Sequence, residues 1–270
     1  MDRPAPPLSD LAITYEPSPN FGPRRGGARP DMVVLHYTAM QSAEAALTRL
    51  CDPVCEVSAH YLICPKGRVW RMVAEEMRAW HAGAGAWGDV TDVNSRSIGI
   101  ELSNAGDHPF AEPQMAALEA LLRAIMTRWE IAPHRIIGHS DMAPARKIDP
   151  GVRFDWRRLA RRGLSVWPAP QGAPQPKPLP KSAWEAFLRD AARFGYRRPD
   201  VVGGADAAQS GSDTGSDGGN DTGNGAAPSA EALLLDAFRQ RFRPWAAGQG
   251  APLDGADCAA MADLAARYGL

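Results

Sequence analysis

Short apolar runs rich in β-branched residues predict a β-sheet in the first half of the chain. These runs are residues 32–37, 60–64, 68–73, 98–102 and 135–139. The second and third runs are joined by Pro65-Lys66-Gly67, which is short enough for a hairpin. Because the hairpin is antiparallel and helical segments separate the other runs, we expect a mixed sheet.

Apolar residues at intervals of three and four predict helices. The expected helices span residues 43–50, 113–129, 154–162, 182–196, 230–241 and 257–268. Ser42 suits the N-cap of the first helix, and Pro113 suits the first turn of the second. The predicted fold class is α/β, with a central mixed β-sheet flanked by helices and a small C-terminal three-helix domain.

Composition divides the chain into several parts. Residues 1–31 are rich in Pro, Gly and Arg, so we expect an extended N-terminal arm without regular elements. Residues 32–165 form the expected main domain, and the Pro-rich residues 166–181 a semi-stiff linker. The helical residues 182–270 are interrupted at 203–228 by a Gly/Ser/Asp/Asn tract, which is expected to be a disordered loop.

The 270-residue chain carries a formal net charge of −1. A charge so close to zero gives no electrostatic reason to expect a nucleic-acid partner. No segment approaches the roughly 18 apolar residues of a membrane span, and no positive region followed by an apolar run opens the chain. We therefore expect a cytoplasmic protein, or a periplasmic one if the true start lies upstream. The sequence does not fix the oligomeric state, and a monomer is the default expectation.

The cysteines Cys51, Cys55, Cys64 and Cys258 are too few and too scattered for a disulfide framework. Cys51 and Cys55 lack a second pair at zinc-finger spacing. Reduced, half-buried thiols are expected.

Residues 136–151 place His139, Lys147 and Asp149 in one loop behind a short buried strand. Imidazoles and carboxylates are zinc ligands, and a catalytic zinc needs three of them with one position left open for water. His36 ends another strand, so a central sheet could bring His36, His139 and Asp149 to one edge. Taken singly, each has a plainer explanation, such as a core histidine or an aspartate that caps a turn.

Glu101 lies among apolar strand residues, where a partly desolvated carboxylate suits a general base. The alternative role for Glu101 is that of a strand-end glutamate in an ion pair with an arginine. Lys147 would point its ammonium at a carbonyl oxygen that becomes negative, and its alternative is a solvated loop lysine. Together these residues predict a zinc hydrolase centre.

Five ordered motifs give the chain a family resemblance. They are residues 35–38, residues 57–63, Trp80-His81-Ala82-Gly83, Asn94 leading to residues 97–102, and residues 138–151. Together they resemble the zinc-dependent N-acetylmuramoyl-L-alanine amidases of the amidase type 2 family, AmpD/AmiD branch, with the peptidoglycan-recognition-protein fold. The resemblance covers residues 15–165 and makes residues 32–165 the expected zinc amidase catalytic domain.

By this resemblance His36, His139 and Asp149 hold Zn²⁺, Glu101 is the base and Lys147 stabilises the transition state. These are the residues that the pattern alone singles out.

The resemblance also implies that Trp80, His81, Asn94 and Arg146 bind substrate, Arg146 through a bidentate pair with a stem-peptide carboxylate. His60 is expected to be structural or to support a ligand, whereas His108 and His134 are expected at the surface. Residues 233–255 resemble the helical peptidoglycan-binding domain that follows the catalytic domain in AmiD-like amidases.

The predicted function is hydrolysis of the amide between N-acetylmuramic acid, or its anhydro form, and the L-alanine of peptidoglycan stem peptides. The expected partners are muropeptides or intact peptidoglycan, in cell-wall recycling or turnover. Two alternatives stay open. One is a non-catalytic peptidoglycan-recognition module, which would need a missing ligand or base, and the other is a different zinc amidohydrolase.

Overall fold

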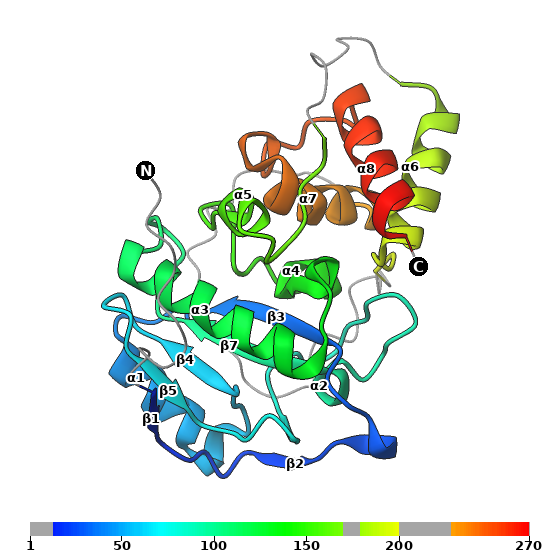
Figure 1. Ribbon diagram of the computed structural model, residues 1–270. Helices are drawn as coiled ribbons and strands as arrows, with labels where there is room; N and C mark the ends of the chain where they lie inside the picture. Colours follow the sequence, from blue (N-terminus) through cyan, green and yellow to red (C-terminus); the bar gives the residue numbers. More distant parts are fainter. Residues whose placement is uncertain (1–12, 170–178, 200–227, 270) are drawn as a thin grey trace.

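The computed structural model describes residues 13–169, 179–199 and 228–269, and a mixed β-sheet lies at its centre (Figure 1). Within these residues the six strands run in the order β1 (Ile13–Tyr15), β5 (Val69–Arg71), β4 (Tyr61–Ile63), β7 (Ser97–Leu102), β3 (Met32–Tyr37) and β8 (Ile136–Gly138). Neighbouring strands are parallel except β4 and β5, which form the predicted hairpin. The predicted mixed sheet is confirmed.

One face of the sheet is covered by α3 (Glu112–Trp129), close to the predicted span (Figure 1). Alternate residues of β3 and β7 pack against this helix in one buried cluster, among them Leu35, Ile100, Leu118 and Leu122. Because successive strand residues point to opposite faces, the next residues along these strands, His36 and Glu101, point away from α3.

The opposite face is covered in two parts. On the β4–β5 side lies α1 (Ala43–Cys51), whose Leu50 packs with Leu62 and Trp70. The predicted N-cap is confirmed, because the Ser42 hydroxyl accepts the Ala45 N–H at 3.1 Å. On the β8 side lies α4 (His139–Met142).

The helices α6 (Lys181–Phe194), α7 (Ala230–Phe242) and α8 (Gly255–Tyr268) form the predicted C-terminal three-helix unit. Phe187 and Phe238 from this unit share one buried cluster with Val34 of β3 and Ile137 of β8. The unit therefore packs directly on the sheet domain, beyond α4 in Figure 1. Residues 170–178 of the predicted linker and residues 203–227 of the predicted disordered loop lie outside the described residues.

The N-terminal arm differs from expectation, because residues 13–31 do contain regular elements. Strand β1 pairs with β5, and β2 (Phe21–Pro23) pairs with β6 (Met77–Ala79) in a second, two-stranded sheet. The expectation of no regular elements is wrong here because β1 itself contains no proline and the single proline of β2, Pro23, is the last residue of a short strand with only one neighbour, a position that tolerates proline.

Some short elements also differ from expectation. β8 stops at Gly138, so His139 begins α4 instead of ending a strand. The helix α5 (Trp156–Arg161) is shorter than predicted, and the one-turn helix α2 (Val93–Arg96) is additional. Short 3-10 helices span Arg25–Gly27, Pro53–Cys55, Pro133–Arg135 and Pro244–Ala246.

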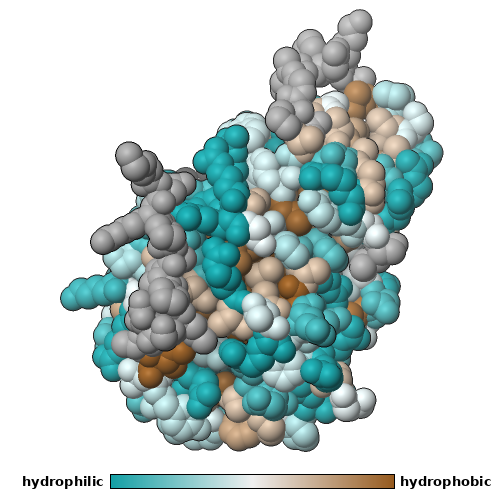
Figure 2. All heavy atoms as spheres, in the orientation of Figure 1, coloured by the Kyte–Doolittle hydropathy of each residue, from teal (hydrophilic) through white to brown (hydrophobic). Residues whose placement is uncertain are grey.

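The face shown in Figure 2 is mainly polar, with apolar side chains in separate patches. Two exposed apolar side chains, Ile148 and Val152, border the loop that carries Asp149. None of the helices in the described ranges has the length and apolarity needed to cross a lipid bilayer.

Candidate metal centre

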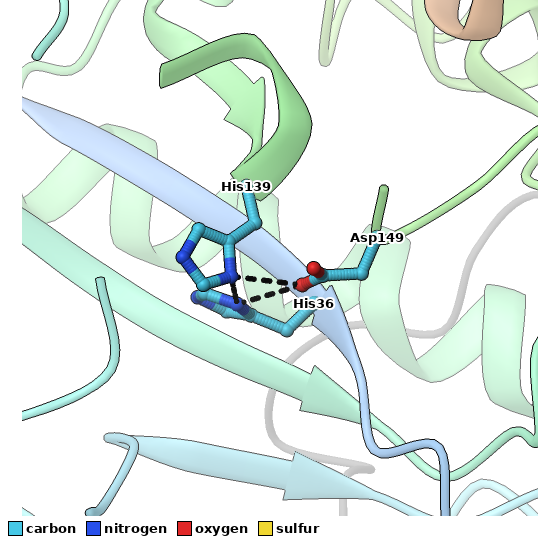
Figure 3. Close-up of side chains that lie close together, drawn as sticks. All are labelled: His36, His139 and Asp149. Carbon is cyan, nitrogen blue, oxygen red and sulfur yellow. Dashed lines mark hydrogen bonds and ion pairs between the residues drawn. The ribbon is translucent and has the colours of Figure 1, made fainter. Parts of the chain in front are cut away.

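Three predicted ligands, His36, His139 and Asp149, meet at the end of the central strands (Figure 3). Nδ1 of His36 lies 2.9 Å from Nδ1 of His139 and 3.0 Å from Oδ2 of Asp149, and His139 Nδ1 lies 3.1 Å from the same oxygen. All three side chains are buried. The structure thus gathers into one triangle residues that lie up to 113 positions apart.

The sheet explains why these residues meet. β3 lies between β7 and β8, and the pairing of Leu35 with Gly138 places His36 and His139 side by side, one residue further along. The loop after α4 then returns to the site, where the Ser140 N–H donates to the Asp149 carbonyl at 2.9 Å. This bond fixes the backbone at Asp149 next to the helix that His139 begins.

The second nitrogen of each imidazole is also engaged. His139 Nε2 lies 2.9 Å from the carbonyl oxygen of Ala82, which can only accept, so Nε2 carries the hydrogen and Nδ1 presents a lone pair. His36 Nε2 lies 3.0 Å from His81 Nδ1. Metal-binding histidines in proteins are held in the same way, by a partner on the nitrogen that does not bind the metal.

Electrostatics favour the charge states that a metal requires. Burial lowers the pKa of His36 to about 4, and the neighbouring His139 adds to this effect. Burial alone would raise the pKa of Asp149, but its interactions with His139 and His36 outweigh burial and hold that pKa far below its ordinary value. At neutral pH the cluster therefore contains a neutral His36 imidazole and an ionised Asp149 carboxylate.

The spacing of the three atoms fits a small tetrahedral ion. Ligand atoms bound to zinc at about 2.0–2.1 Å in tetrahedral geometry lie roughly 3.3 Å apart. The observed spacings of 2.9–3.1 Å are slightly shorter, so a small outward movement would admit the ion. Two imidazoles and one carboxylate match the donor set of catalytic zinc sites, which leave a fourth position open.

The predicted catalytic pair lies beside this cluster. Glu101 is paired in register with His36 on the neighbouring strand, so both side chains point to the same face, and Glu101 Oε2 is shielded from solvent. Lys147 is half-buried, and its positive charge contributes to the lowered pKa of His36, after burial and His139. The roles of Glu101 and Lys147 as base and oxyanion stabiliser stay predictions.

Two of the predicted substrate contacts hold the loop that follows β6. The buried Asn94 Oδ1 accepts the N–H groups of His81 and Ala82 at 3.0 and 2.9 Å. Arg146 Nη2 donates to the carbonyls of Ala82 and Ala84, each at 2.6 Å. These bonds shape the edge of the site, and direct contact of Asn94 or Arg146 with substrate stays a prediction.

The other two predicted contacts also have protein partners. Trp80 is half-buried, and its backbone N–H donates to the Ser58 hydroxyl at 2.9 Å. His81 lies against His36 and Ser97. Burial lowers the pKa of His81 well below its ordinary value, with His36 as the next cause. Substrate contact by these two residues stays a prediction.

The remaining histidines lie outside the cluster. His60 is fully buried, and its Nδ1 accepts the Gly99 N–H at 2.9 Å; whether it is structural or supports a ligand stays a prediction. His108 is exposed as predicted, whereas His134 is half-buried and stacks on Tyr268.

Sequence reasoning missed Ser97 and Gly99, which lie on the same face of β7 as Glu101. Ser97 contacts His81 through its hydroxyl, and Gly99 leaves room for the His81 ring. Two small residues at alternate positions of a buried strand, before Glu101, are the signal that could have revealed them.

Residues 26–152 match the family model described as N-acetylmuramoyl-L-alanine amidase. The chain is 36% identical over 198 residues to the N-acetylmuramoyl-L-alanine amidase AmiD of Escherichia coli K12, an alignment that covers 64% of this chain and 70% of AmiD. It is 33% identical over 160 residues to the 1,6-anhydro-N-acetylmuramyl-L-alanine amidase AmpD of Citrobacter freundii, covering 53% of this chain and 86% of AmpD.

Solved structures give the same result. The complex of E. coli AmiD with the substrate anhydro-N-acetylmuramic acid-L-Ala-D-gamma-Glu-L-Lys has a TM-score of 0.70 at 31% identity, covering 90% of this chain and 92% of that one. AmpDh3 of Pseudomonas aeruginosa in complex with anhydromuramic pentapeptide has a TM-score of 0.67 at 27% identity, covering 95% and 97%. Both similarities extend beyond the sheet domain into the C-terminal helices. The chain therefore belongs to the N-acetylmuramoyl-L-alanine amidase family and is an enzyme of that class.

Proposed function

We propose that this chain is a zinc-dependent hydrolase that cleaves the amide between the lactyl group of N-acetylmuramic acid, or its anhydro form, and the L-alanine of a stem peptide. The observation that carries the proposal is the triangle of His36 Nδ1, His139 Nδ1 and Asp149 Oδ2, with sides of 2.9–3.1 Å. AmiD and AmpD carry this activity in their names, and AmiD was solved with an anhydro-N-acetylmuramic acid peptide as its substrate.

In this proposal His36, His139 and Asp149 hold Zn²⁺. When bound, zinc polarises the substrate carbonyl and lowers the pKa of a water toward neutrality. Glu101 accepts the proton of the attacking water and delivers it to the amine of the departing L-alanine. Lys147 supplies a positive charge near the carbonyl oxygen, which becomes negative as the tetrahedral intermediate forms.

The loop of residues 80–84 would form one side of the substrate groove. Asn94 and Arg146 support this role because they bond to the loop backbone at Ala82 and, for Arg146, at Ala84. Besides the predicted direct contacts with substrate, these two residues would shape the groove through this loop. Recognition of intact peptidoglycan by the C-terminal helices stays a prediction.

The test is incubation of the purified protein with an anhydro-N-acetylmuramoyl tripeptide and, separately, with its ordinary muramoyl counterpart. Mass spectrometry should detect the free tripeptide, and the two rates give the preference between sugar forms. H139A and D149A should lose both bound zinc and turnover, whereas H108A, at an exposed position, should keep both. Binding of an intact muropeptide without cleavage would indicate a recognition module, and full activity without metal would contradict the zinc mechanism.

The predicted cytoplasmic location and monomeric state also stay predictions. Fractionation of the producing cells followed by an immunoblot tests the first, and recovery from the periplasm would contradict it. Light scattering of the purified protein tests the second.

A further inference from the structure

His81 lies between the candidate ligand His36 and strand β7. Its Nδ1 is 3.0 Å from His36 Nε2, and its Nε2 is 3.1 Å from the Ser97 hydroxyl. The ring lies directly over Gly99, where an added Cβ would be 2.4 Å from the His81 Cγ. The glycine therefore allows the imidazole to lie flat against the strand and reach His36.

The contacts run from Val93 through Ser97 and His81 to His36, and the Val93 end fixes which group donates in each hydrogen bond. The Ser97 hydroxyl lies 2.6 Å from the carbonyl oxygen of Val93. Because a carbonyl oxygen can only accept, Ser97 donates its single hydroxyl hydrogen to Val93. Towards His81, Ser97 can then only accept. His81 Nε2 must carry a hydrogen, and in the neutral ring Nδ1 is left as an acceptor.

An acceptor at His81 Nδ1 requires a donor at His36 Nε2. A neutral His36 that carries its hydrogen on Nε2 has a lone pair on Nδ1, the atom that faces His139 and Asp149. The relay from Val93 through Ser97 and His81 thus selects the tautomer of His36 that can bind a metal through Nδ1.

The two histidine ligands differ in how this selection is made. His139 is held by the Ala82 carbonyl oxygen, which can only accept a hydrogen bond. His36 is held by another imidazole, which could donate or accept, so its direction depends on Ser97.

We infer that His81 is a positioning residue, which together with Ser97 fixes the ring and tautomer of His36 for zinc. The inference deepens the proposed function and rests on zinc binding by His36, His139 and Asp149. It differs from the substrate contact that the sequence predicts for His81.

The test compares variants at two positions of the relay. H81L removes the acceptor, and H81N keeps an amide oxygen near the position of Nδ1. H81Q places its amide at the Ser97 end, so the His36 partner is lost. S97A leaves His81 in place without its acceptor. H108L, at an exposed histidine, is the matched control.

Zinc affinity is measured by competition with a chromogenic chelator, without any substrate. H81L and H81Q should bind zinc about 10- to 100-fold more weakly, as for other residues that support a metal ligand. H81N should recover most of this loss, S97A should show a smaller loss, and H108L none.

The tautomer is measured directly in the metal-free protein through the ¹⁵N shifts of the His36 ring. The wild type should show the hydrogen on Nε2, and H81L and S97A should show a mixture of both tautomers. If H81L does not fold, the zinc affinity and the His36 tautomer of H81N and S97A test the inference instead.

Unchanged zinc affinity and an unchanged His36 tautomer in H81L, H81Q and S97A would overturn the inference, as would a raised KM with normal zinc binding in H81L. A wild-type protein that binds no zinc would instead contradict the proposed function itself.

Discussion

Glu101 and His36 are neighbours in register on β7 and β3, so the predicted base lies next to a candidate zinc ligand and outside the cluster of His36, His139 and Asp149. E101Q keeps the shape of the side chain but removes its capacity to take a proton. We expect kcat to fall about 10²- to 10⁴-fold while zinc content stays unchanged. Muropeptide turnover and atomic absorption check the two quantities, with E76Q, at an exposed glutamate, as the control. A loss of less than tenfold would exclude Glu101 as the base.

His60 predicts a pH dependence of folding stability that does not involve the metal. Burial lowers its pKa to about 3, and the nearby Arg24 guanidinium adds to the effect. Since an unfolded histidine titrates near about 6.5, the unfolded chain binds more protons than the folded one between these values. Stability is therefore complete above this window and falls as the pH falls through it.

H60N removes this titration but keeps an oxygen that can accept the Gly99 N–H. The free energy of unfolding of the metal-free protein, measured by urea titration between pH 7 and pH 5, should depend less on pH in H60N than in the wild type. The difference is at most about 1.4 kcal/mol per pH unit for one group. If the free energy of unfolding depends on pH equally in H60N and in the wild type, His60 is not the cause of the pH dependence.

The ligand candidates could be predicted from sequence because each carries distinctive chemistry at the end of a strand or in a loop. The contacts of His81 and Arg146 could not. Both depend on how the 80–84 loop lies over β7 and the Asp149 loop, which is a matter of packing between segments distant in sequence.

At the scale of elements, α3 and the metal candidates lie on opposite faces of the sheet. L118A should therefore lower the free energy of unfolding by about 2–5 kcal/mol, because Leu118 is fully buried against the strands. Zinc affinity of the folded variant should stay within twofold of the wild type. The control R123A, on the exposed side of α3, should change stability by less than about 0.5 kcal/mol. A loss of zinc affinity in L118A would show that the two faces are coupled.

Long elements with a clear apolar period, such as α3 and α7, could be predicted almost to their ends. Short elements could not, because partners elsewhere in the chain stabilise them. α2 begins where the Asp92 side chain accepts the Ser95 N–H, and Arg78 from β6 holds that carboxylate. β2 and β6 have only three residues each, and each lacks an apolar alternation that would reveal it.

At the scale of the whole molecule, a buried ion pair joins the C-terminal helices to the metal-site segment. Arg241 of α7 donates to Asp141 Oδ2 at 2.7 Å and to the Ile136 carbonyl at 2.8 Å. The Tyr196 hydroxyl donates to the other oxygen of Asp141. Asp141 lies two residues after His139, in the same short helix.

R241M should lower the free energy of unfolding by about 3–5 kcal/mol, because it leaves the carboxylate of Asp141 buried without its cation. R189M, which breaks an ion pair whose arginine is 66% exposed, should cost less than about 1 kcal/mol. Urea unfolding followed by fluorescence measures both values. Equal effects of the two variants would contradict a structural role of the Arg241 pair.

The Arg241–Asp141 pair also limits how the chain can be recombined. Composition suggests the Pro-rich linker as a natural place to exchange the C-terminal helices for those of another protein. A chimera made there would bury Asp141 without a cation and expose the side of Ile137 that Phe238 helps to cover. Only a donor that supplies an arginine at the place of Arg241 and an aromatic hydroxyl at the place of Tyr196 would preserve the segment that begins with His139.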